Sequence, residues 1–235
     1  MNLMGKTVLI TGGARRLGRA MALELAAQGA NIALHFRSFP EEAFATLNQI
    51  EHCGVQAAAF QANLLQSEEL ADMVAQVYRT FGQVDVLINN AAVFDRKPFF
   101  ELTEADWDHT LDTNLKIPFL CSRLVGEKML GQGAGKIINL ACVGGVRPWA
   151  NFIPYSVSKA GLIMLTEALA LALAPLIQVN AIAPGRIEFP GQPLPDLPSF
   201  PSGQPQDITR AVRYLIESDY VTGETLLVDG GRHLR

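Results

Sequence analysis

The chain has few of the residues that disulfides, metal sites and extracellular folds require. Its 235 residues include three cysteines, Cys53, Cys121 and Cys142, which are far apart and form no C-x-x-C pair. This spacing argues against a disulfide framework and a cysteine zinc site, and it predicts a cytoplasmic protein. The four histidines are also scattered, so we expect no metal ion.

Charge and apolar patterning argue against two kinds of partner. The net charge is −4 and no block of Lys and Arg occurs, so we expect no nucleic-acid partner. The N-terminus has no apolar region typical of a signal peptide. The most apolar long stretch, residues 160–177, contains Thr166, Glu167 and Pro175. It therefore predicts a buried helix and no membrane partner.

What is present predicts one α/β domain spanning residues 1–235. Apolar residues make up 49% of the chain and charged residues 18%, which suits a large core. Short apolar runs alternate with helical patterns, which predicts a Rossmann-type, doubly wound parallel sheet of about seven strands with helices on both faces. The expected strands are Thr7–Thr11, Asn31–Phe36, Gln56–Gln61, Val84–Asn89, Lys136–Leu140, Gln178–Ile182 and Thr225–Val228. The expected helices are Leu17–Gln28, Glu41–Cys53, Ser67–Phe81, Glu104–Leu130, Asn151–Ala174 and Gln206–Ile216, and Thr103 with Asp106 predicts a capped start for the fourth.

A proline-rich segment follows the sixth expected strand. Residues 190–205 hold six of the 13 prolines and no Lys or Arg. The segment is either a plain linker or a substrate loop. We favour the loop, because segments at the carboxyl edge of such a sheet cover the ligand crevice.

The first strand leads through a glycine-containing turn, residues 11–18, into the first helix. Such a turn lets the backbone approach a pyrophosphate, and the helix N-terminus favours its negative charge. The second strand ends at His35, Arg37 and Ser38, with no acidic residue from Asn31 to Phe39. An Arg at this point accommodates a 2′-phosphate, with Arg15 as a second candidate cation, so the sequence predicts NADP(H).

Tyr155 and Lys159 lie four residues apart and so share one helix face. An ammonium beside the phenol is expected to lower the pKa of Tyr155, which makes the tyrosine a candidate acid–base group. This pair, the glycine turn, Asn89-Asn90-Ala91-Ala92, Asn180–Gly185 and Asp229-Gly230-Gly231 together resemble the short-chain dehydrogenase/reductase family over nearly the whole chain.

The resemblance implies roles for individual residues. Tyr155 would relay the proton, Lys159 would bind the nicotinamide ribose and tune Tyr155, and Asn114 would continue the relay through water. Asn63 replaces the family's adenine-contacting Asp. The cofactor site would comprise Gly12, Arg15, Arg16, Leu17, His35, Arg37, Ser38, Asn63, Leu64, Asn90, Ala91, Ala92, Tyr155, Lys159, Pro184, Gly185 and Ile187.

Two positions depart from the family pattern. Cys142 stands where the family has a Ser that holds the substrate oxygen, and a thiol is a weaker hydrogen-bond donor. Cys142 is therefore either a catalytic residue or a small buried apolar residue. Arg16 stands where the turn normally has its middle Gly.

Arg16, the strand end His35–Ser38 and the tail after Leu227 resemble the pteridine reductase branch of the family. Phe94 falls where these enzymes stack a Phe on the pterin, although Phe94 is equally explained as core. The resemblance predicts an NADPH-dependent reductase of dihydropterins or dihydrofolate, with a substrate site of Arg16, Phe94, Cys142 and Tyr155. That branch has Asp at the position of Cys142.

Two alternatives stay open. A carbonyl reductase, such as a 3-oxoacyl-thioester reductase, would need an apolar channel, for which Leu194, Leu197 and Phe200 of the proline-rich segment are suited. A non-catalytic NADP-binding sensor would explain the missing Ser but not the intact Tyr155 and Lys159. The resemblance also implies a homotetramer built on the fourth and fifth helices.

Overall fold

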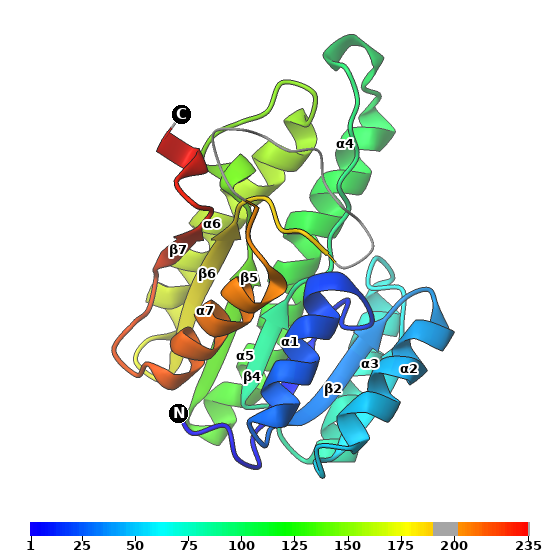
Figure 1. The fold of residues 1–235 in the computed structure, drawn as a ribbon, viewed down its shortest axis with the longest axis vertical. Coiled ribbons are helices and arrows are strands. Elements are labelled where there is room, and N and C mark those ends of the chain that lie inside the picture. Colours follow the sequence, from blue (N-terminus) through cyan, green and yellow to red (C-terminus); the bar gives the residue numbers. More distant parts are fainter. Residues whose placement is uncertain (190–201, 235) are drawn as a thin grey trace.

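Seven parallel strands form one sheet with helices on both faces (Figure 1). The computed structural model describes residues 1–189 and 202–234. The strand order is β3-β2-β1-β4-β5-β6-β7, so the order reverses beside β1. The predicted doubly wound fold is therefore confirmed, and the reversal places the ligand crevice at the carboxyl ends of β1 and β4.

The strands lie within one or two residues of their predicted bounds. They are β1 (Thr7–Ile10), β2 (Asn31–Phe36), β3 (Ala57–Gln61), β4 (Val86–Asn89), β5 (Gly135–Leu140), β6 (Ile177–Pro184) and β7 (Thr225–Val228). The α-helices are α1 (Arg16–Ala27), α2 (Pro40–Glu51), α3 (Ser67–Phe81), α4 (Glu104–Leu111), α5 (Ile117–Gln132), α6 (Ile153–Leu173) and α7 (Pro205–Glu217).

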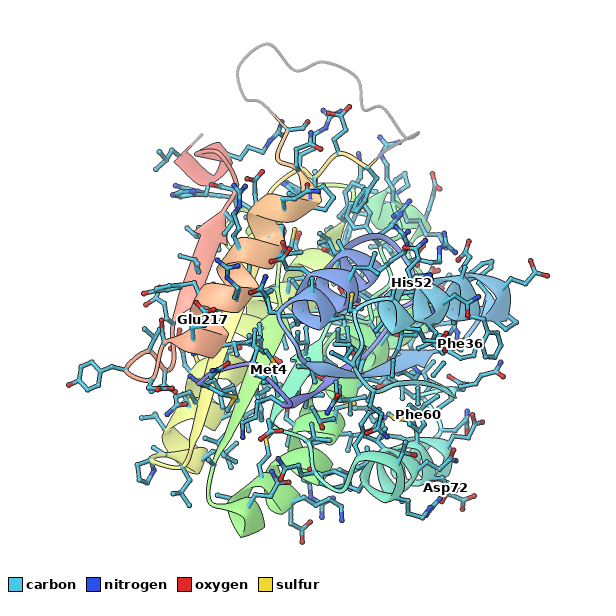
Figure 2. All side chains as sticks on the ribbon, turned by 60° about the horizontal axis from the view of Figure 1, so that its bottom comes forward. Met4, Phe36, His52, Phe60, Asp72 and Glu217 are labelled. Atoms are coloured by element: carbon cyan, nitrogen blue, oxygen red, sulfur yellow. The ribbon has the colours of Figure 1, made fainter. Side chains whose placement is uncertain are left out.

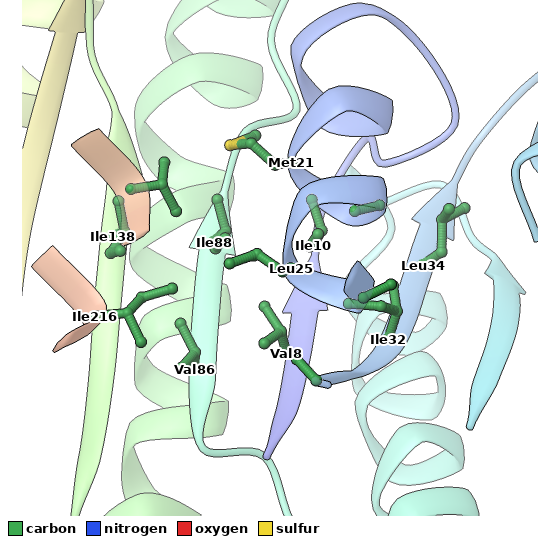
Figure 3. Close-up of a cluster of buried hydrophobic side chains, with 14 of the residues drawn as sticks. Val8, Ile10, Met21, Leu25, Ile32, Leu34, Val86, Ile88, Ile138 and Ile216 are labelled. Atoms are coloured by element: carbon green, nitrogen blue, oxygen red, sulfur yellow. The ribbon is translucent and has the colours of Figure 1, made fainter. Parts of the chain in front are cut away.

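Successive strand residues point to opposite faces and fill two cores. Val8 and Ile10 of β1 pack in the core that α1, α2 and α7 cover, where Met21 and Leu25 of α1 lie over them (Figure 3). Leu9 points into the opposite core, which α3, α5 and α6 cover. Charged residues of the covering helices, among them Asp72 and Glu217, lie on the outer surface (Figure 2).

The single helix predicted over Glu104–Leu130 is wrong. The Thr103 side chain and Asp106 form the predicted capping box, but α4 ends at Leu111 and a π-helical turn, η2 (Asp112–Lys116), joins it to α5. Pro118 has no N–H to donate to the carbonyl four residues earlier, that of Asn114. A regular α-helix therefore cannot pass through this point, and the turn widens.

Helix α6 is, among the described residues, the one helix long and apolar enough to cross a membrane by length and composition. It packs on β6, with Leu162, Thr166 and Ala170 buried, and it carries Tyr155 and Lys159 into the crevice. A core helix of this kind passes the same test.

The proline-rich segment lies mostly outside the described residues, so its covering role stays a prediction. Its end is described: Gly203 pairs with Ile187 just after β6, and Pro205 begins α7 one residue before the predicted start. A proline is tolerated there because the first helical N–H needs no partner within the helix.

Candidate active site

A cavity of about 800 Å³ lies at the carboxyl ends of the strands. The turn after β1 and the ends of β2, β4, β5 and β6 all contribute to its lining, as does α6. All of the predicted cofactor residues line this cavity, and so do the four predicted substrate residues. Of the predicted site, Asn114 alone is not among the described lining residues.

The glycine turn is held against the end of β4. Asn90 Nδ2 donates to the carbonyls of Thr11 and Gly12, both at 2.9 Å. A Cβ on Gly18 would lie 2.1 Å from the Gly12 carbonyl, so no larger residue fits there. The first turn of α1 is thereby fixed against the backbone of Gly12, which suits it to hold a pyrophosphate.

His35 holds the same turn from the β2 side. Its Nδ1 lies 3.1 Å from the Gly12 N–H, which donates to it, and its Nε2 lies 3.0 Å from the Ala62 carbonyl. These partners require a neutral ring with the proton on Nε2. Burial lowers the pKa of His35 to about 4, and the charge of Arg37 acts in the same direction. We infer that His35 positions the turn.

This burial predicts a pH dependence of stability. The folded pKa of His35 lies below the unfolded value of 6.5, so the unfolded chain binds the proton first. The free energy of unfolding should fall as the pH falls from 6.5 to 4, by about 3 kcal/mol from this group. Denaturant unfolding of the native chain and of His35→Gln at several pH values measures the difference. If both show the same pH slope in this window, the assignment is wrong.

Arg37 and Arg15 lie at the end predicted for the adenosine 2′-phosphate. Among the described residues, no carboxylate lies within salt-bridge distance of Arg37, whereas Arg15 Nε is 3.1 Å from Glu42 Oε2. The Arg15 guanidinium also lies 4.3 Å from the centre of the Phe39 ring. Arg37 is therefore the better candidate for binding a phosphate, and Glu42 partly neutralises Arg15.

Arg16 adopts a backbone conformation that glycine normally takes, with φ of 46°. Its guanidinium faces the Phe189 ring at 5.8 Å, and both residues line the cavity. A left-handed conformation costs an L-residue roughly 1–2 kcal/mol. Strain of this kind concentrates at functional sites, so an Arg in this conformation points to a function for its side chain.

The strain is measurable with two variants that both remove the guanidinium. The free energy of unfolding of Arg16→Gly should exceed that of Arg16→Ala by about 1 kcal/mol, because glycine relieves the backbone strain and alanine keeps it. Urea denaturation of the two proteins makes the comparison. Equal stability of the two variants would show that the positive φ costs nothing.

Tyr155, Lys159 and Cys142 come together at the centre of the cavity. Burial raises the pKa of Tyr155 well above its usual value, and the neighbouring Cys142 side chain raises it further. Burial lowers the pKa of Lys159 to about 8, and its Nζ donates to the Leu140 carbonyl at 2.7 Å. The prediction that the ammonium lowers the pKa of Tyr155 is therefore wrong for the protein without its cofactor. A protonated phenol is the form that a proton donor requires.

Asn114 lies in the π-helical turn, and both polar atoms of its side chain form hydrogen bonds. Its Oδ1 accepts from the Val93 N–H at 2.9 Å, and its Nδ2 donates to the Val93 carbonyl and to Ser158 Oγ. Its amide thus ties η2 to the segment after β4 and to α6. The backbone carbonyl, which receives no bond from Pro118, is the group of Asn114 suited to hold a water.

The predicted Phe94 belongs to a cluster of aromatic rings beside Tyr155, whose other members, Trp149 and Phe152, sequence reasoning missed. Phe94 stacks on Phe152 with ring centres 4.5 Å apart and meets Tyr155 edge-on at 4.6 Å. Trp149 lies parallel to Tyr155 at 6.3 Å and, like Phe94, lines the cavity. Trp149 and Phe152 come just before Tyr155 in the sequence, and that proximity was the available signal. One face of Phe94 is thus already covered by another ring.

Comparison with known proteins agrees with this geometry. The family model described as short chain dehydrogenase matches residues 6–192. A 3-oxoacyl-[acyl-carrier-protein] reductase FabG of Staphylococcus epidermidis is 36% identical, over 98% of this chain and 100% of that protein. The solved acetoin dehydrogenase of Enterobacter cloacae superimposes with a TM-score of 0.92 at 32% identity, covering 99% of this chain and 97% of its own. A solved actinorhodin polyketide ketoreductase with NADPH gives 0.90 at 30% identity, covering 98% of both chains.

Motifs, sheet order, cavity and full-length relatives agree. The chain belongs to the short-chain dehydrogenase/reductase family of oxidoreductases.

Proposed function

We propose that this protein is an NADPH-dependent carbonyl reductase that acts on 3-oxoacyl thioesters or related ketones. The observation that carries the proposal is the placement of Tyr155, Cys142 and Lys159 together in a cavity of about 800 Å³. The relatives support the same reading, because one is named a 3-oxoacyl reductase and one a polyketide ketoreductase. They favour this alternative over the pteridine reductase that Arg16 and the β2 end predict.

The residues present fit a nicotinamide dinucleotide. The turn at Gly12 and the N-terminus of α1 would receive the pyrophosphate, and the described end of β2 offers Arg37 and Ser38 to a 2′-phosphate and no carboxylate. Bound NADPH would supply the hydride. The solved ketoreductase with NADPH supports the choice of this cofactor.

The chain's own residues would supply the proton and orient the carbonyl. Tyr155 would donate its hydroxyl proton to the carbonyl oxygen as negative charge develops there. Cys142 lies where a side chain would hold that oxygen. It is hydrogen-bonded to Tyr155, and its Sγ accepts from the Gly144 N–H at 3.4 Å. Lys159 would bind the ribose, and its ammonium would stabilise the tyrosinate that proton transfer leaves. A water on the Asn114 carbonyl would pass a proton from solvent back to Tyr155.

Cys142 gives a graded test of this arrangement. Cys142→Ser should raise kcat on a ketone roughly two- to tenfold, because a hydroxyl is the stronger donor to the developing oxyanion. Cys142→Ala is the matched control and should lower it. Steady-state kinetics with a neutral diketone measures both. If the two variants equal the native enzyme, Cys142 only fills space.

A pterin reductase is the second candidate function. Arg16 and Phe94 line the same cavity as Tyr155, and a guanidinium with an aromatic ring suits a flat heterocycle. However, the ring of Phe94 is stacked on Phe152 on one side, so a pterin would have only its other face.

One screen separates the candidates. NADPH oxidation is followed with acetoacetyl thioesters, simple diketones, dihydrobiopterin and dihydrofolate. We expect turnover of the thioesters or diketones. Turnover of the pterins alone would replace the proposal by the second candidate. If the protein binds NADPH tightly but reduces none of these compounds and no related ketone, the remaining reading is the non-catalytic cofactor-binding sensor.

We further propose that the protein works in the cytoplasm as a homotetramer. Exposed apolar residues lie along α5 and α6, namely Phe119, Val157, Met164 and Leu171. A helix pair with such a surface is suited to pack against a second copy. Light scattering after gel filtration tests this, and a monomer at micromolar concentration would contradict it.

A further inference from the structure

The cavity is more cationic than the cofactor alone requires. Six cationic side chains and no Asp or Glu are found among its described lining residues. They are Arg15, Arg16, Arg37, Lys159, Arg186 and Arg232. Arg15 and Arg37 lie at the end suited to the 2′-phosphate, and Lys159 lies at the centre. Arg186 and Arg232 belong to the opposite end of the sheet.

The fold brings Arg186 and Arg232 together from neighbouring strands. Arg186 follows β6 by two residues and Arg232 follows β7 by four, and β6 and β7 pair through Pro184 and Val228. A Cβ on Gly185 would lie 2.7 Å from the Cα of Asp229. The segment that carries Arg186 is therefore in tight contact with the turn that carries Arg232.

The turn around Arg232 is rigidly held. Asp229 accepts from the Gly231 N–H at 2.9 Å and from the His233 N–H at 2.7 Å, and His233 Nδ1 lies 2.8 Å from the same carboxylate. Arg147 Nε donates to the His233 carbonyl at 2.9 Å. Asp229 is thus used within the turn and is not among the described residues that line the cavity.

We propose that Arg186 and Arg232 form a binding site for an anionic group of the carbonyl substrate, either a carboxylate or a phosphate. This inference rests on the proposed carbonyl reduction and adds a substrate class to it. With the ketone at Tyr155 and Cys142, the β6–β7 end of the cavity receives the remainder of the substrate. Guanidinium groups bind carboxylates and phosphates through charge-assisted hydrogen bonds.

The test compares substrates that differ in charge. Acetoacetate carries a carboxylate, acetoacetyl-CoA carries phosphates, and methyl acetoacetate and the acetoacetyl thioester of N-acetylcysteamine carry neither. We expect Arg186→Gln and Arg232→Gln to lower the ratio of kcat/KM for an anionic substrate to that for its neutral partner by at least about tenfold. Arg186→Lys should restore part of the ratio. A lower ratio for acetoacetate against methyl acetoacetate identifies a carboxylate as the bound group. A lower ratio for acetoacetyl-CoA against the N-acetylcysteamine thioester identifies a phosphate.

Controls and a binding measurement make every outcome decisive. Arg79→Gln, on the exposed side of α3, should leave the ratio unchanged. An unchanged ratio in both test variants, or a loss matched by weaker NADPH binding, overturns the proposal. If no ketone is reduced, calorimetry of 3-hydroxybutyrate and of its CoA thioester, each with the NADP⁺ complex, separates the two ideas. Binding that Arg186→Gln abolishes keeps the anion site although the proposed reaction fails, and absence of binding to the native protein rejects the site.

Discussion

Tyr155→Phe is expected to lower kcat for ketone reduction by about 10²–10⁴-fold, the range that a positioned general acid contributes. In the proposed reaction the phenol is the proton donor, and burial raises its pKa, which favours the protonated form. The variant keeps the ring, and with it the contacts to Phe94 and Trp149. The NADPH Kd should therefore change by less than about twofold, because the cofactor needs the site's shape and not this proton.

Stopped-flow measurement of the hydride step and fluorescence titration of NADPH separate these two effects. Tyr214→Phe, a half-exposed tyrosine on α7, is the matched control and should behave as the native enzyme. Lys159→Ala should damage both turnover and cofactor binding, since its ammonium would serve the ribose and Tyr155. A Tyr155→Phe enzyme with native turnover would show that another group donates the proton.

Arg37→Asp is expected to reverse the cofactor preference from NADPH to NADH. Each charge-assisted contact to the 2′-phosphate contributes roughly 1.5–3 kcal/mol, which is about 10- to 150-fold in Kd. An aspartate at the end of β2 would repel the phosphate and accept from the free 2′-hydroxyl of NADH. Titration of both cofactors against both proteins measures the reversal.

Arg15→Gln is the informative comparison for this prediction. Because Glu42 already pairs with Arg15 at 3.1 Å, its removal should weaken NADPH binding less than Arg37→Gln does. The NADPH affinity of both variants should also depend less steeply on salt than that of the native protein. Equal binding of NADPH and NADH by the native protein would refute the assignment of Arg37.

The fold was predictable where local pattern and burial agree. Helix α3 has its predicted bounds, Ser67–Phe81, because its apolar residues recur at helical spacing and Gly82 ends it. The start of α4 just after Thr103 was also predictable, because its cap depends on two residues three positions apart. The break at Asp112–Lys116 was missed, although Pro118 was visible in the sequence, because an apolar helical pattern continues on both sides of it.

The sequence by itself determined the framework of this protein and the cofactor end of its cavity. In a parallel sheet every strand's carboxyl end lies at one edge, so motifs that follow strands, such as Gly12, Arg37 and Asn90, converge there whatever the intervening helices. Their spacing from the strands was enough to place them.

The tertiary structure alone decided the electrostatics and the substrate end. The pKa of Tyr155 rises because the residue is buried beside Cys142, and burial depends on residues far away in the chain. The placement of Arg186 and Arg232 at one end of the cavity likewise requires β6 and β7 to lie side by side. Such contacts leave no periodic trace in the sequence, because they depend on distances between segments that are folded together from separate parts of the chain.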